Sequence, residues 1–108
     1  MKITVRREAC GYQDDQVGRL EAEYTVEADA TFSSLVQEII ASRFLQFTST
    51  HDQVTGEANG VELVEIFSPY TANPRQPEFK VDPGACAADL LDERSLSFSF
   101  RHVRPFAP

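Results

Sequence analysis

Hydrophobic and polar residues alternate in two stretches near the start of the chain, which is the pattern of strands with one buried face. Ile3 and Val5 alternate with polar neighbours and predict a first strand. The alternation is more regular over residues 20–29 and predicts a second strand that runs to Ala28. Its polar side carries Glu21, Glu23, Thr25, Glu27 and Asp29. The segment 10–19 contains glycines and polar residues and predicts a loop between these strands.

The hydrophobic period then changes from 2 to 3.6, which marks an amphipathic helix with one buried stripe. The residues of this stripe are Phe32, Leu35, Val36, Ile39 and Ile40. Thr31 is the expected N-cap, because its hydroxyl can accept a hydrogen bond from a first-turn backbone N–H. We expect the helix to end near Ser42 or Arg43.

Two further strands and a hairpin are expected after the helix. Residues 44–47 are largely hydrophobic and precede three hydroxyl residues that favour extended backbone, so they predict a third strand. The polar segment 51–60 ends in Asn59-Gly60, a pair that accepts positive φ at both positions of a tight hairpin turn. Residues 61–67 predict the strand that follows this turn.

Prolines dominate the next part of the chain. Four of them lie within residues 68–84 and exclude a long regular element there, although 78–81 can form a short edge strand. Asp82-Pro83 predicts the N-cap and first position of a short helix that runs to about Leu91. The last strand is expected over 95–103. Its inward residues are Leu96, Phe98 and Phe100.

This order of elements (strand, strand, helix, strand, strand, short helix, strand) resembles that of the ubiquitin-like β-grasp family. The resemblance is carried by the first strand at Met1–Arg6, by 21–28 with the helix after it, and by Ala88–Phe100. In this last segment a short helix, an acidic turn and an alternating strand follow one another in the family's order. The family's di-glycine is replaced here by a final Ala107-Pro108, so conjugation to lysines is not expected.

The resemblance implies an α+β fold in which a mixed sheet of four or five strands packs on one main helix, with a short second helix. It also implies that the first strand lies between the second and the last. We expect one domain over residues 1–108, with a folded core of 1–103 and a tail of 104–108.

Composition narrows the function classes. The chain has 108 residues and a formal net charge of −7, which disfavours general binding to nucleic acid or anionic membranes. The N-terminus has no apolar stretch of the kind that follows the basic residues of a signal peptide, so we expect a cytoplasmic protein. Two cysteines are too few for a disulfide framework or for an iron–sulfur cluster, and we expect no cofactor.

Catalytic signatures are sparse. The sequence has no glycine-rich phosphate loop, no nucleophile-elbow motif and no Cys-x-x-Cys pair. His51 and Asp52 form the one histidine–carboxylate neighbour pair, and Cys10 lies in a predicted loop. We interpret His51 as a solvated loop residue, His102 as a residue at the sheet's edge and Cys86 as a core residue. No metal site is expected, because the acids of the loop before the hairpin do not follow a calcium-binding pattern.

The excess negative charge has a definite location. Residues 1–68 carry the whole net −7, since acids and bases balance in the rest of the chain. We therefore predict a non-enzymatic protein-binding module, of the inhibitor or immunity type, for a basic partner. The expected partner-binding residues are Asp14, Asp15, Glu21, Glu23, Glu27, Tyr12 and Tyr70. Lys2 and Arg6 of the first strand are expected to neutralise part of this acidic face.

A second hypothesis is a small enzyme or small-molecule carrier. It would use a pocket under the long loops, near His51, Asp52 and Cys10. This hypothesis requires at least two of these side chains to converge in one concave site.

Overall fold

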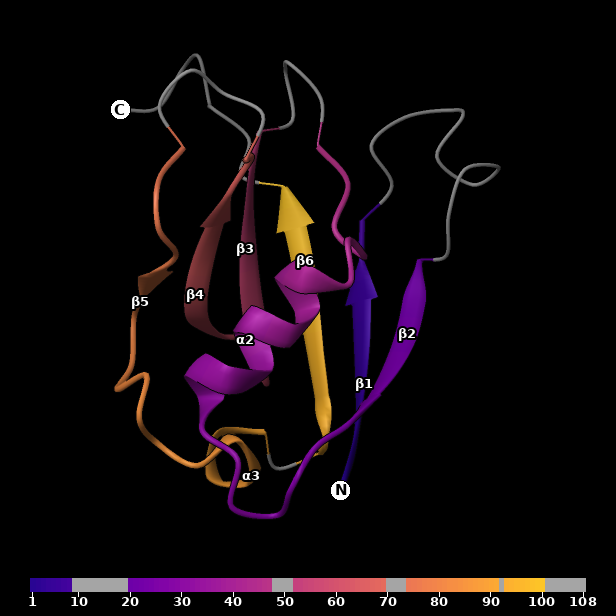
Figure 1. Ribbon diagram of the computed structural model, residues 1–108, viewed down its shortest axis with the longest axis vertical. Helices are drawn as coiled ribbons and strands as arrows, with labels where there is room; N and C mark the ends of the chain where they lie inside the picture. Colours follow the sequence, from indigo (N-terminus) through magenta and orange to yellow (C-terminus); the bar gives the residue numbers. More distant parts are fainter. Residues whose placement is uncertain (9–19, 48–51, 70–73, 92, 101–108) are drawn as a thin grey trace.

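The structure is a computed structural model that describes residues 1–8, 20–47, 52–69, 74–91 and 93–100. Over these residues the chain forms an α+β fold with a mixed six-stranded sheet and two helices (Figure 1). The elements are β1 (Lys2–Arg7), β2 (Glu21–Thr25), α2 (Phe32–Ala41), β3 (Gln53–Ala58), β4 (Val61–Phe67), β5 (Glu78–Phe79), α3 (Ala87–Leu90) and β6 (Ser95–Phe100).

The strands lie in the order β2-β1-β6-β3-β4-β5. The neighbours β1 and β6 are parallel, and the other four pairs are antiparallel. The first strand therefore lies between the second and the last, as predicted. The sheet has six strands rather than the predicted four or five, because the two-residue β5 pairs with β4 at the sheet's edge.

Helix α2 crosses one face of the sheet and forms the core with it (Figure 1). Its predicted stripe is buried at Phe32, Leu35, Val36 and Ile39. The predicted N-cap is confirmed, since the Thr31 side chain accepts a hydrogen bond from the Ser34 backbone N–H at 3.1 Å. The strands β1 and β6 contribute every second residue to this core, and β3 and β4 contribute consecutive buried residues. These buried residues include Ile3, Val5, Tyr24, Val54, Val64, Ile66, Leu96, Phe98 and Phe100.

The helix ends at Ala41, close to the predicted position, and Arg43 follows in the left-handed conformation with φ 60°. The prediction of a third strand at residues 44–47 is wrong, because these residues form no strand and lie in an irregular segment in which Leu45 is buried. Their hydrophobic side chains pack beneath the end of the helix instead of pairing in the sheet.

The third strand lies instead at β3, in the segment that the sequence predicted as a polar turn. The sequence did not predict this strand because Gly56, which is uncommon in strands, lies in its middle. This glycine is buried in the sheet, where a neighbouring side chain occupies the space of a Cβ. A Cβ there would lie 2.7 Å from Phe98 Cε1. The hairpin turn after β3 is confirmed, with φ of 54° at Asn59 and 78° at Gly60.

The second helix begins later than predicted. Asp82 is not its N-cap, since the Asp82 carboxylate accepts the Gly84 backbone N–H at 2.9 Å and closes a local turn. The helix α3 starts after Cys86, which is half-buried rather than a core residue. The last strand has the predicted inward residues, and its predicted extension over 101–103 lies outside the described residues.

Candidate functional site

The structure describes three of the seven predicted partner-binding residues. Glu21 and Glu23 lie on β2 and are exposed on the face of the sheet opposite the helix. Tyr12, Asp14, Asp15 and Tyr70 lie outside the described residues, as do His51, His102 and Cys10. The acidic surface is therefore described at its strand but not at its predicted loop.

Glu27 lies outside this strand. The predicted strand continued to Ala28, but β2 ends at Thr25. The Ala30 backbone N–H donates to the Glu27 carbonyl at 3.0 Å, which closes a turn leading into the helix. Because a turn breaks the alternation of a strand, Glu27 is exposed at the end of the sheet rather than aligned with Glu21 and Glu23.

The first of the two strand carboxylates is partly neutralised, as predicted. Arg6 lies opposite Glu21 in the ladder, and its Nε is 2.8 Å from Glu21 Oε1. Both side chains are 56% exposed, so the pair contributes about 0.2–1 kcal/mol at most. Glu23 lies opposite Thr4 and has no basic partner among the described residues. Its charge is therefore available to a partner.

The strand β2 forms one edge of the sheet, and no described strand pairs with its outer side. The Arg7 backbone N–H donates to the Leu20 carbonyl at 2.9 Å, and the Val26 N–H donates to the Met1 carbonyl at 2.9 Å. Because backbone direction alternates along an antiparallel strand, Glu21 and Glu23 direct their own N–H and C=O groups away from β1. The residues that carry exposed carboxylates thus also carry the outward-facing backbone groups.

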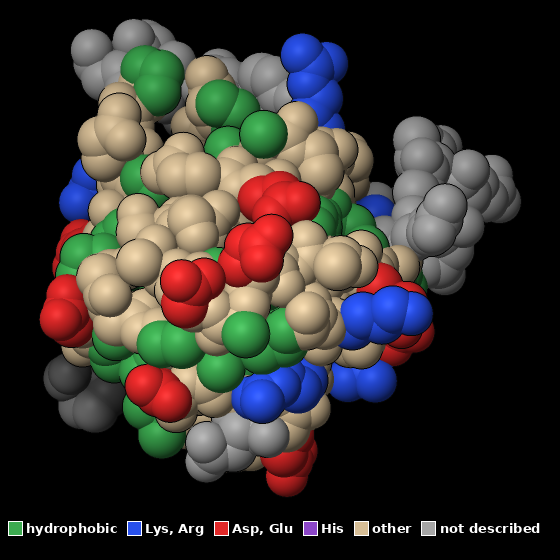
Figure 2. Space-filling view, turned by 60° about the horizontal axis from the view of Figure 1, so that its bottom comes forward, with side chains coloured by type: hydrophobic (Ala, Val, Ile, Leu, Met, Phe, Trp, Pro, Cys, Tyr) green, Lys and Arg blue, Asp and Glu red, His purple; other side chains and the backbone are tan. Residues whose placement is uncertain are grey.

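Acidic side chains are not confined to this edge. Figure 2 shows them across much of the face it presents, among small apolar patches. The exposed acids beyond the sheet edge include Asp29, Glu38, Glu62, Asp89 and Glu93. What distinguishes β2 is therefore its edge geometry rather than its charge alone.

Two charged side chains are buried in the sheet. Arg7 is 7% exposed on the helix side of β1, and its guanidinium carbon lies 5.5 Å from the centre of the Phe44 ring. Glu65 on β4 is 4% exposed and accepts a hydrogen bond from Gln53 Nε2 at 2.8 Å. The Lys80 ammonium lies 3.9 Å from its other oxygen. Both groups have partners, which is what a buried charge requires.

The tyrosine that joins β2 to the end of the helix is also perturbed. Burial raises the pKa of Tyr24 above its ordinary value of 10.0, and the nearby Glu38 charge adds to this effect. The Tyr24 hydroxyl lies 2.6 Å from Ser42 Oγ, and Ser42 in turn donates to the Ile39 carbonyl at 2.7 Å. This contact is structural, because it ties the last turn of α2 to the edge strand.

Two of the three residues proposed for catalysis, His51 and Cys10, lie outside the described residues. Of His51, Asp52 and Cys10, the structure describes Asp52, which is exposed and whose carbonyl accepts the Ser68 N–H at 2.8 Å. The described residues contain no group of three or more His, Cys, Asp or Glu side chains placed to hold a metal ion. Within the same ranges, neither helix has the length and apolar character needed to cross a membrane.

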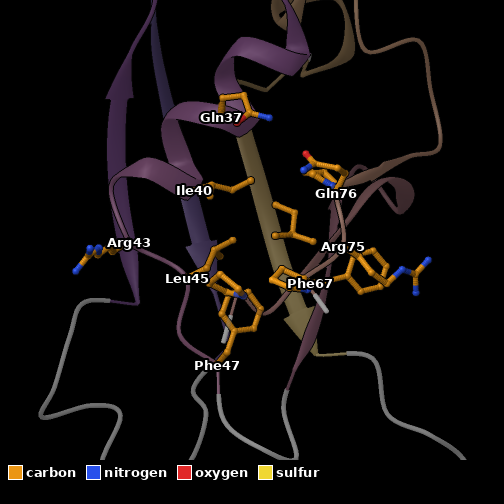
Figure 3. A pocket seen from close by; sticks show the side chains of 12 residues that line it. Gln37, Ile40, Arg43, Leu45, Phe47, Phe67, Arg75 and Gln76 are labelled. Atoms are coloured by element: carbon orange, nitrogen blue, oxygen red, sulfur yellow. The ribbon is translucent and has the colours of Figure 1, made fainter. Parts of the chain in front are cut away.

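A pocket of about 230 Å³ lies between the end of α2 and the connection from β4 to β5 (Figure 3). It was not predicted, because its walls come from segments that are distant in the sequence. The lining residues are Gln37, Ile40, Arg43, Leu45, Phe47, Ile66, Phe67, Pro69, Pro74, Arg75, Gln76 and Pro77. The irregular segment after the helix, predicted as a strand, forms one wall of this pocket.

The polar part of this lining consists of two arginines and two glutamines. The Arg75 guanidinium carbon lies 4.0 Å from the centre of the Phe67 ring, and its Nη2 lies 3.4 Å from Glu78 Oε2. Arg43 is exposed and has no ion pair with any described residue. The pocket is thus apolar inside and basic at its sides.

No protein-family model matches this chain, and neither a curated protein nor a solved structure matches it.

Proposed function

We propose that this chain is a non-enzymatic protein-binding module with a ubiquitin-like β-grasp fold, and that its acidic β2 edge binds a basic partner. The fold assignment is supported by the order of the five longer strands, β2-β1-β6-β3-β4, and by the parallel pairing of the first with the last. It is also supported by the single long helix that connects the β2 side of the sheet to β3.

One observation supports the binding proposal. The residues of β2 that carry exposed carboxylates also direct their backbone N–H and C=O groups away from β1. Glu21 and Glu23 are exposed, two residues apart, and point their backbone groups away from the sheet. An extended segment added at this edge would gain main-chain hydrogen bonds. Basic side chains at every second position of that segment would then face the two carboxylates, about 6.6 Å apart.

A small acidic protein with such an edge fits the role of an inhibitor or immunity-type protein for a basic partner. The net charge of −7 accelerates the encounter with a cationic protein, and the edge then fixes the orientation of the complex. Such binding requires no catalytic group.

The proposal is tested by adding a peptide of alternating lysine and valine to the ¹⁵N-labelled protein and following backbone amide shifts by NMR. We expect saturable shifts at the outward-facing amides of Glu21, Glu23 and Thr25, and weaker binding at higher salt. A peptide with glutamate in place of lysine serves as the charge control. Shifts spread evenly over the acidic surface would refute the proposal.

Matched variants sharpen this test. Replacing Glu21 and Glu23 together by glutamine removes two cross-strand charge pairs, each contributing about 0.2–1 kcal/mol, so the affinity should fall roughly 2- to 30-fold. Replacing the exposed Glu62 and Glu93 by glutamine changes the net charge equally but leaves the β2 edge intact. Equal losses in the two double variants would show that net charge alone drives binding.

The alternative is an enzyme or carrier that uses His51, Asp52 and Cys10. The structure describes only Asp52 of these residues, and its position does not support this alternative. Asp52 is exposed and does not line the pocket described above.

A further inference from the structure

The pocket between α2 and the β4–β5 connection is separate from the β2 edge, since the strands β1, β6 and β3 lie between β2 and β4. Its inner surface is formed by Ile40 and Leu45 on one side and by Ile66 on the sheet. Figure 3 shows the side chains of Ile40 and Leu45 directed into it from the helix side. This arrangement exposes hydrophobic surface in a concave site rather than on a flat face.

The size of the pocket sets the size of its occupant. An engineered protein cavity of about 150 Å³ lined by apolar side chains takes up benzene. With about 230 Å³, this pocket has room for one aromatic ring with a short substituent, or for an aliphatic chain of roughly six to eight carbons. Such a ligand would be small, with most of its surface apolar.

The charges around the pocket select the head group. Although the chain has a net charge of −7, no acidic residue is among the described residues that line this pocket, whereas Arg43 and Arg75 are. Figure 3 shows Arg43 and Arg75 on opposite sides of the pocket, with their guanidinium groups directed away from its centre. Arg75 also pairs with Glu78, so Arg43 is the lining arginine that has no ion pair with a described residue. Gln37 and Gln76 add amide donors to the same rim.

We propose that this pocket binds a small anionic amphiphile, a monocarboxylate with a single ring or a short aliphatic chain. Its apolar part packs against Ile40, Leu45 and Ile66, and its carboxylate remains at the rim, where the flexible Arg43 side chain can turn toward it. Because ligand pockets combine a mostly apolar lining with a few oriented polar groups, this chemistry matches the site. The proposal is independent of partner binding at the β2 edge.

The test compares octanoate with its neutral amide, octanamide, in the complete chain labelled with ¹³C at isoleucine and leucine methyl groups. We expect octanoate to shift the methyl signals of Ile40, Leu45 and Ile66 saturably, in about the millimolar range for a ligand of this size. Octanamide should shift the same signals but bind more weakly. Equal affinities for the two compounds, or shifts that do not saturate, would overturn the proposal.

Two variants separate the head-group contact from general charge. Arg43→Asn removes one guanidinium, and asparagine tolerates the left-handed backbone of this position, where φ is 60°. It should weaken octanoate binding about 1.5- to 5-fold, the range for one exposed charge pair, and leave octanamide binding unchanged. Arg6→Gln removes an equal charge on β1, which lies three strands away from β4 in the sheet, and should change neither affinity. An equal effect of Arg6→Gln on octanoate binding would contradict the proposed site.

Discussion

Replacing Gly56 by alanine tests the packing of the sheet against the core. Gly56 lies in β3 opposite Val64 on one side and Phe98 on the other. An added Cβ would lie 2.7 Å from Phe98 Cε1 and 3.0 Å from Val64 Cγ1, and both neighbours are themselves buried. The methyl group therefore cannot be accommodated unless the Phe98 ring or the strand moves.

Two opposing terms set the magnitude. Overpacking a well-filled core costs about 1–3 kcal/mol. Gly-to-Ala replacement gains about 0.4–1 kcal/mol, because the unfolded chain has fewer conformations to lose. Since the backbone of Gly56 is not left-handed, no conformational strain is added. The net loss from these terms is roughly 0–2.6 kcal/mol. Because the added methyl group would lie 2.7 Å from a buried ring, we expect the upper part of this range, a loss of about 1–2.6 kcal/mol in the free energy of unfolding.

Urea unfolding followed by circular dichroism measures this change. With a typical denaturant slope for a small domain, the midpoint should fall by roughly 0.5–1.5 M. Gly84→Ala is the matched control, because its nearest contact would be 3.4 Å away and its backbone is not left-handed, so it should be neutral or slightly stabilising. Gly60→Ala has open space but a φ of +78°, and should lose stability through backbone strain alone.

A double-mutant cycle identifies the cause. Phe98→Leu in the Gly56→Ala background should relieve the crowding, so the two changes together should destabilise less than the sum of the single changes. The same Phe98→Leu change should not rescue Gly60→Ala. A Gly56→Ala variant as stable as the wild type, or strict additivity in the cycle, would refute the packing explanation.

Three further predictions concern single contacts. Because its folded-state pKa is raised, Tyr24 contributes stability that is present below pH about 10 and lost as the pH rises through the folded-state pKa. Tyr24→Phe should therefore flatten the fall in urea midpoint at alkaline pH, at a cost of about 1 kcal/mol at neutral pH for the bond to Ser42. Thr31→Ala should cost about 0.5–2 kcal/mol by thermal unfolding, whereas Thr31→Ser should restore most of it, and equal losses would contradict a capping role. A double-mutant cycle on Arg6 and Glu21 should give a coupling of about 0.2–1 kcal/mol that falls with added salt, and a larger, salt-independent value would contradict an exposed pair.

Strong local patterns in the sequence predicted much of the fold. The helix has a hydrophobic stripe and a capping threonine, both of which depend on neighbours within one or two turns. The Asn59-Gly60 turn depends on two residues that accept positive φ. The alternation in β1, β2 and β6 places its buried side chains correctly, although the predicted acidic strand was three residues too long at its C-terminal end. Glu21 and Glu23 of the candidate site were found by this alternation.

The errors arose where long-range packing outweighed local preference. Residues 44–47 are largely hydrophobic, as in a strand, but their side chains pack against the core without joining the sheet. Leu45 and Phe47 also line the pocket. The strand β3 carries a glycine and several polar residues, yet it pairs with β4 on one side and β6 on the other. Its glycine leaves room for the Phe98 ring, which a side chain at position 56 would contact too closely. The need for a glycine at position 56 comes from Phe98, which is 42 positions away in the sequence, so the residues around Gly56 give no sign of it.

The positions of the helix and the hairpin turn and the acidic alternation of the second strand can be read from the residue pattern, because each follows from interactions between near neighbours. That this strand is an edge with outward backbone groups appears in the folded chain alone, since strand order depends on pairing between distant segments. Only in the folded chain do Arg43 and Arg75 also stand beside one apolar pocket, because closing the chain brings the end of α2 against the β4–β5 connection. The distribution of acids along the sequence locates the excess negative charge, and none of these acids is among the described residues that line this pocket.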